Sequence, residues 1–102
     1  MDKREVIEIV RAYKMAILSV VENAQVYLYG SYSKGTAHKD SDIDVAVVVP
    51  QILGNRWELS SSLWGATWNI NTLIEPILLD ASHPSPLYED VMRTGIAISR
   101  FA

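Results

Sequence analysis

Two short apolar segments, Val26–Tyr29 and Val45–Val49, constrain the fold of this chain most tightly. Both are built from β-branched or aromatic residues, which is typical of buried strands. The connection between them contains the turn Gly30-Ser31, a further glycine at Gly35, and two aspartates, Asp42 and Asp44. The stretch therefore predicts two strands joined by a polar, glycine-containing connection.

Asp42 and Asp44 are two residues apart at the start of the second segment. Residues i and i+2 of a strand lie on one face, about 6.7 Å apart along its axis. Like charges this close repel unless something neutralises them, and a divalent metal ion does so through oxygen ligands. Taken alone, such a pair is more typical of a solvated strand start, so it indicates a metal site only in combination with other features.

The Gly30-Ser31 turn offers what a phosphate group needs. Glycine lets the backbone approach closely, and the N–H groups of a helix that starts at the turn attract anions. Alone, the dipeptide is an ordinary turn, and Ser41 is equally suited to be a turn former that opens the second strand. A phosphate-binding turn followed by paired carboxylates indicates metal-dependent phosphoryl or nucleotidyl transfer.

Residues 30–44 match the pattern G-S-x-x-x-G-x-x-x-x-x-S-D-I-D. In this pattern the chain resembles the DNA polymerase beta-like nucleotidyltransferase superfamily, and in size and layout its minimal branch. The resemblance implies an α+β fold with a small mixed or antiparallel sheet flanked by helices, mainly on one face. It also implies a metal-dependent enzyme that moves a nucleoside monophosphate, AMP from ATP, to a hydroxyl with the help of two Mg²⁺ ions.

The resemblance assigns roles to individual residues. Asp42 and Asp44 would hold the metal ions, and Ser31 would contact a nucleotide phosphate. The further phosphate-binding candidates are Gly30, Lys34, Gly35 and Ser41. For Lys34, a solvated surface position is the more ordinary interpretation.

A third carboxylate is expected where the superfamily usually shows an aspartate on the strand after the intervening helix. Here that strand contains Glu75, followed by Pro76. A glutamate inside an apolar strand is seldom placed there without a partner, which favours Glu75 as the third catalytic and metal-binding residue. The alternative is that Glu75 faces water at a sheet edge, since proline within strands favours edges. Asp80, expected beyond the strand end, is a weaker candidate.

Minimal nucleotidyltransferases often accompany a small helical protein of the HEPN type as a toxin–antitoxin pair. The resemblance therefore implies a protein partner, which the enzyme would adenylylate. The alternative function is a catalytically weak or inactive nucleotidyltransferase-like binding or antitoxin module. A Glu75 placed beside Asp42 and Asp44 favours the enzyme, and a misplaced Glu75 favours the binding module.

Length and composition bear on the number of domains, on nucleic-acid and membrane binding, and on the cellular compartment. With 102 residues the chain has room for one domain, 1–102, and its net charge of −3 gives no broad basic surface for nucleic acid. No apolar segment approaches the roughly 18 residues of a membrane span. The chain has no cysteine, which fits a reducing compartment, and we expect a cytoplasmic protein.

Hydrophobic periodicity and turn signals place the other elements. They predict helices over 3–22, 31–39, 56–70 and from Pro86 to Gly95, and strands over 72–79 and 96–99. The 56–70 segment has two opposed stripes, one of Leu59, Leu63, Ala66 and Ile70 and one of Trp57, Trp64 and Trp68. One stripe is expected to meet a partner or a second copy, unless the segment breaks at Gly65 and both enter one core.

Overall fold

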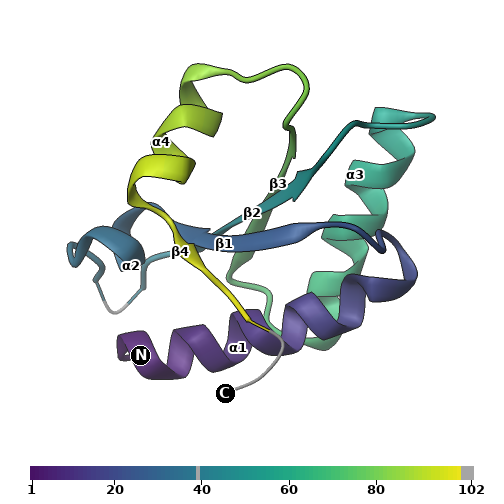
Figure 1. Cartoon of the computed structure of the whole chain (residues 1–102). Coiled ribbons are helices and arrows are strands. Elements are labelled where there is room, and N and C mark those ends of the chain that lie inside the picture. Colours follow the sequence, from purple (N-terminus) through teal and green to yellow (C-terminus); the bar gives the residue numbers. More distant parts are fainter. Residues whose placement is uncertain (39, 100–102) are drawn as a thin grey trace.

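The computed structural model describes residues 1–38 and 40–99 of the chain. A four-stranded mixed sheet with the order β3-β2-β1-β4 forms its centre (Figure 1). The strands are β1 (Gln25–Tyr29), β2 (Ile43–Val49), β3 (Ile74–Asp80) and β4 (Ile96–Ala97). β1 runs antiparallel to β2 and β4, whereas β2 and β3 are parallel. The predicted α+β fold is confirmed.

Helix α1 (Lys3–Ala16) and the short 3-10 helix η1 (Ile17–Ser19) precede the sheet. Asp2 caps α1, because its side chain accepts a hydrogen bond of 2.8 Å from the Glu5 N–H. Val6, Val10 and Tyr13 recur at helical spacing and are fully buried. The helix predicted over 3–22 therefore begins where expected but ends earlier.

Helix α3 (Arg56–Gly65) continues into the 3-10 helix η2 (Ala66–Asn69), which together match the predicted 56–70 helix closely. Asn55 caps α3 by accepting from the N–H groups of Trp57 and Glu58. Gly65 has helical backbone angles, so the helix does not break there. Helix α4 (Pro86–Thr94) starts after Ser85, whose side chain accepts from Tyr88 N, with proline at its tolerated first turn.

Helices cover both faces of the sheet (Figure 1). α1 and α3 pack on one face, where alternate β2 residues such as Val45 and Val47 join the larger hydrophobic core. α4 packs on the other, where Val91 contacts a smaller cluster that includes Ala46 and Val48. Because side chains alternate along a strand, Asp44 projects on the α4 face.

Two smaller elements differ from expectation. α2 spans only Ser31–Lys34, and the remainder of the predicted 31–39 helix is irregular up to His38, with Lys39 outside the described residues. The last strand is β4, two residues long, instead of 96–99. Among the described residues, no helix has the length and apolar character to cross a membrane.

Candidate active site

The sheet register brings three polar side chains into one row. Asp44 of β2 is directly opposite Tyr29 of β1 on one side and Glu75 of β3 on the other. Residues directly opposite in neighbouring strands share a face of the sheet, so all three project toward the α4 side. Asp42 lies two residues before Asp44, in the loop that leads into β2. The structure thus places all three predicted carboxylates together.

Electrostatics within this group show that the carboxylates interact. The pKa of Asp44, which is half-buried, is raised by desolvation and by the negative charge of Asp42. The pKa of Glu75 is also raised, first by desolvation, then by the charges of Asp42 and Asp44, and by a hydrogen bond with Asp42. Ionising either group therefore costs more than it does in water.

Glu75 lies beside the aspartates and also faces water at a sheet edge, so both interpretations of the sequence hold in part. It belongs to β3, which is the end strand of the sheet, and its side chain is exposed. It is nevertheless in register with Asp44. Within residues 1–38 and 40–99, no three His, Cys, Asp or Glu side chains are grouped so that they could hold a metal ion. The carboxylates of Asp42, Asp44 and Glu75 are therefore neighbours that affect one another's ionisation, without forming a ready-made metal cage.

Gly30 lies against the side chain of Asp44. Its backbone has φ of 71° and ψ of −147°, a region that is essentially restricted to glycine. A Cβ atom built on Gly30 would overlap Oδ2 of Asp44 and lie 3.0 Å from its Cγ. The absence of a side chain at Gly30 thus lets the turn and the carboxylate come into direct contact.

The turn leads into α2, so Ser31 starts a helix as expected. Gly35 ends this helix with φ of 74°, and its N–H donates to the carbonyl of Ser31. The Ser33 hydroxyl donates to the Gly30 carbonyl over 2.9 Å. These bonds hold the Gly30-Ser31 turn in a defined shape beside Asp44.

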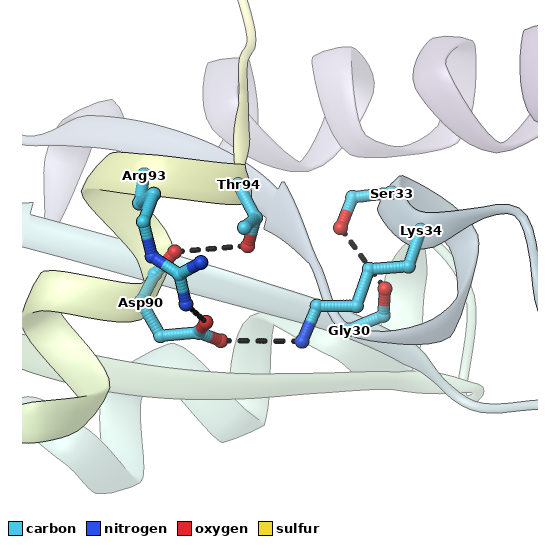
Figure 2. Close-up of polar contacts among 6 residues, drawn as sticks. All are labelled: Gly30, Ser33, Lys34, Asp90, Arg93 and Thr94. Carbon is cyan, nitrogen blue, oxygen red and sulfur yellow. Dashed lines mark hydrogen bonds and ion pairs between the residues drawn. The ribbon is translucent and has the colours of Figure 1, made fainter.

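Lys34 points from α2 toward α4 (Figure 2). Its ammonium lies 3.3 Å from one oxygen of Asp90, and the guanidinium of Arg93 lies 2.8 Å from the other. The Thr94 hydroxyl donates to the Asp90 carbonyl over 2.9 Å. Lys34 is therefore neither simply solvated nor already turned toward the Gly-Ser backbone.

Ser41 and Asp80 have local structural partners. The Ser41 hydroxyl accepts a hydrogen bond of 2.7 Å from the N–H of His38, which closes the loop before β2. Asp80 is the last residue of β3 and not beyond it, and its carboxylate accepts from Ile52 N and from Ser82. Asp80 thus joins two loops at the opposite end of β3 from Glu75.

Sequence reasoning missed Tyr29 and Asp90. Burial, followed by the negative charges of Asp44 and Glu75, raises the pKa of the Tyr29 phenol to about 12. Tyr29 is the residue before Gly30, and the antiparallel pairing of β1 with β2 was the signal that could have placed it beside Asp44. The contact between Asp90 and Lys34 spans 56 positions of sequence, and no local pattern indicates it.

Comparison with known proteins agrees with this arrangement. The nucleotidyltransferase domain family matches residues 4–75, which include α1, the Gly-Ser turn, β2 and Glu75. The chain belongs to the nucleotidyltransferase domain family. The matched region is more than half of the chain and contains Asp42, Asp44, Glu75 and the phosphate-binding candidates, whereas Asp80 lies beyond it.

Two relatives have been given functional names. A protein adenylyltransferase, MntA, of Shewanella oneidensis is 54% identical over 43 residues, which are 40% of this chain and 31% of that protein. The match thus spans less than a third of that relative. A provisionally named protein adenylyltransferase of Methanocaldococcus jannaschii is 24% identical over 98 residues, covering 92% of this chain and 99% of that protein.

A solved structure extends the similarity to the fold. A toxin–antitoxin complex crystallised with AMP-PNP contains a chain that is 29% identical and superposes with a TM-score of 0.60. The alignment covers 87% of this chain and 72% of the other.

Proposed function

We propose that the chain transfers AMP from ATP to a hydroxyl group, and that the acceptor belongs to a partner protein of the toxin–antitoxin type. Membership of the nucleotidyltransferase family supports nucleotidyl transfer. The name of the Shewanella relative supports protein as the acceptor, and the complex with AMP-PNP supports an adenine nucleotide and a protein partner.

The observation that supports this function best is the register of Asp44 with Glu75, beside the Gly30-Ser31 turn. It brings the carboxylates and the phosphate-binding candidates to one end of β2. Carboxylate oxygens are the donors that Mg²⁺ prefers. Desolvation, and then the charges of the neighbouring carboxylates, raise the pKa of Asp44 and of Glu75, and a bound cation would relieve the charge repulsion. These oxygens are thus of the type that magnesium prefers, and Asp42, Asp44 and Glu75 are the proposed ligands.

Bound Mg²⁺ would lower the pKa of the attacking hydroxyl and neutralise the charge of the leaving pyrophosphate. The chain itself binds and orients the nucleotide. Gly30 and Ser31 hold the phosphates through the turn backbone and the serine hydroxyl, and Gly35 lets the loop close behind them. Lys34 and Ser41 lie at the margins of this site. In the reaction the acceptor oxygen forms a bond to the α-phosphorus, and the bond from that phosphorus to pyrophosphate breaks.

Incubation with ATP labelled at the α-phosphate, Mg²⁺ and the protein encoded beside this chain tests the proposal. We expect label on the partner with the wild-type chain. Asp44→Asn and Glu75→Gln should each lower labelling at least 100-fold. Glu58→Gln, an exposed carboxylate on the far helix α3, serves as the matched control and should label normally. Equal labelling by all four proteins would contradict the proposed site.

A second candidate function is a nucleotide-binding or antitoxin module with little catalysis. The exposure of Glu75 on the end strand favours it. A module that binds nucleotide takes up Mg-ATP as the transferase does, so a positive calorimetric result does not distinguish the two. Release of pyrophosphate does, because only the transferase produces it.

A further inference from the structure

Three indole side chains protrude from the α3–η2 segment. Trp57, Trp64 and Trp68 are 81%, 46% and 78% exposed. Together with Ser60, Ser61 and Gly65 they line a shallow hollow of about 490 Å³. We call these six residues the tryptophan face. The chain has three tryptophans in all, so each of them lies on this face.

The tryptophan face is not needed by the core of the chain. The opposite stripe of the same segment supplies Leu63, which is 1% exposed, and Leu59 and Ala66 pack against the same core. The segment therefore already buries one apolar face on the sheet. Large exposed aromatic groups are unusual on a monomer, and aromatic residues are enriched where proteins associate.

The tryptophan face is complementary to a second copy of itself. Its indoles project, while Ser60, Ser61 and Gly65 between them are small and leave the hollow. A two-fold axis that runs between the hollow and a projecting indole would place that indole of one copy in the hollow of the other, because a two-fold interface pairs one patch with itself. None of the six residues is charged, so two copies can meet without bringing like charges together.

The three indoles supply about half of the area of a standard interface. An aromatic side chain buries about 200 Å² in an interface. With the exposed fractions given above, the three indoles offer about 400 Å² per copy, which is half of the roughly 800 Å² that each partner contributes to a standard interface. The flanking helix surface would supply the rest. An interface of this size is consistent with micromolar affinity.

We propose that the tryptophan face is the interface of a symmetric homodimer, with α3 packed against α3 of the second copy. α3 covers the sheet face that carries Val45 and Val47, whereas Asp44 and Glu75 project on the α4 face. The dimer therefore leaves both candidate active sites uncovered. The proposal does not depend on the catalytic activity.

Sedimentation equilibrium of the purified chain over about 1 to 300 µM tests the dimer. We expect a monomer–dimer equilibrium with a dissociation constant of roughly 10 µM. The double variant Trp57→Ala/Trp68→Ala should weaken association at least tenfold, because it removes the two most exposed indoles. Leu53→Ala is the matched control: Leu53 is 80% exposed but lies outside the tryptophan face, so its loss should leave the equilibrium unchanged.

Intrinsic tryptophan fluorescence gives a second readout, since all the indoles lie on the proposed interface. Emission should move to shorter wavelength as concentration rises through the dissociation constant, as water leaves the indoles. Circular dichroism should show that the double variant keeps its fold, because the replaced side chains are exposed. A monomer at every concentration, a dimer that persists in the double variant, or association only when another protein is added would each overturn the proposal.

Discussion

The carboxylate of Asp44 occupies the space that a side chain on Gly30 would need. A Cβ atom on Gly30 would lie 3.0 Å from Cγ of Asp44 and overlap its Oδ2. The contact joins the end of β1 to the start of β2. It means that the position of the Asp44 side chain and the shape of the Gly30-Ser31 turn cannot change independently.

Gly30→Ala should therefore lower the free energy of unfolding and impair nucleotide binding together. The backbone strain alone is of order 1–3 kcal/mol, and displacement of Asp44 adds to it. Urea denaturation measures the first effect and calorimetry with Mg-ATP the second. Gly54→Ala is the control, because Gly54 also has positive φ, of 85°, but no atom lies within 4 Å of a Cβ placed there. Similar losses of affinity in the two variants would argue against the steric role of Asp44.

Asp44→Asn should have opposite effects on stability without and with ligand. Burial and Asp42 raise the pKa of Asp44, so the ionised carboxylate destabilises the folded state at pH above that value. In the presence of a chelator the variant should be more stable, by less than about 1 kcal/mol because the site is partly exposed. At Mg-ATP 100-fold above its dissociation constant, the wild type should gain about 2.7 kcal/mol and the variant much less. Thermal unfolding with and without Mg-ATP measures both effects, and a variant that gains as much as the wild type would disprove the ligand role of Asp44.

Two buried tyrosines should respond in opposite ways to loss of the hydroxyl. Tyr13 donates to the Leu63 carbonyl over 2.6 Å, whereas the Tyr32 hydroxyl is buried without a partner among the described residues. Tyr13→Phe should lower the free energy of unfolding by about 1–2 kcal/mol, because it leaves the carbonyl unsatisfied. Tyr32→Phe should leave it unchanged or raise it by up to about 1 kcal/mol. Equal losses in the two variants, measured by urea denaturation, would show that Tyr32 has a partner in solution.

Acid should destabilise the chain through Asp80. Hydrogen bonds from the Ser82 hydroxyl, from Ile52 N and from Ser82 N, with the charge of His83, lower the pKa of Asp80 to about 2. Its pKa in the unfolded chain is about 3.9, so its contribution is complete above that pH and is lost as the pH falls toward 2. The stability of the wild type should therefore fall more steeply over this range than that of Asp80→Asn. Ser82→Ala removes the largest cause and should shift the steep region toward higher pH; an unchanged profile would contradict this assignment.

Asp90→Asn should increase the affinity for Mg-ATP. Asp90 holds the ammonium of Lys34 at 3.3 Å, and Lys34 is itself 47% exposed (Figure 2). Such surface ion pairs contribute little, so the variant should change stability by no more than about 1 kcal/mol. A released Lys34 can turn to the phosphates and should tighten binding by a few-fold at low salt. The double variant Asp90→Asn/Lys34→Met should lose this gain; a gain that remains would place its origin elsewhere.

The central part of the fold follows from local sequence. Short apolar segments of β-branched and aromatic residues predicted β1 and β2, and the Gly30-Ser31 turn predicted a helix start between them, although α2 is shorter than the predicted 31–39. These strands could be predicted because their residue types, read over a few consecutive positions, already favour a buried strand. The ends of α1 were less predictable, since residues 17–19 wind into a 3-10 helix as they enter the first loop.

The assembly of the candidate site depends on pairings that the sequence does not show. Glu75 could be proposed from its apolar surroundings, but its position opposite Asp44 follows from the parallel register of β2 and β3. The antiparallel register of β1 with β2 places Tyr29 in the same row. Local patterns also left open whether the tryptophans are buried. Because Gly65 keeps helical backbone angles, the segment does not break there, and the three indoles remain exposed.

Pro76 follows Glu75 on β3, the end strand of the sheet. An end strand has unpaired backbone N–H and C=O groups that can pair with a strand of another chain, and such pairing leads to aggregation. Proline has no N–H to donate, and the neighbouring glutamate adds a charge that opposes further pairing. The residues that place a carboxylate beside Asp44 thereby also keep this edge from templating another strand, so that the rim of the site stays open to soluble molecules.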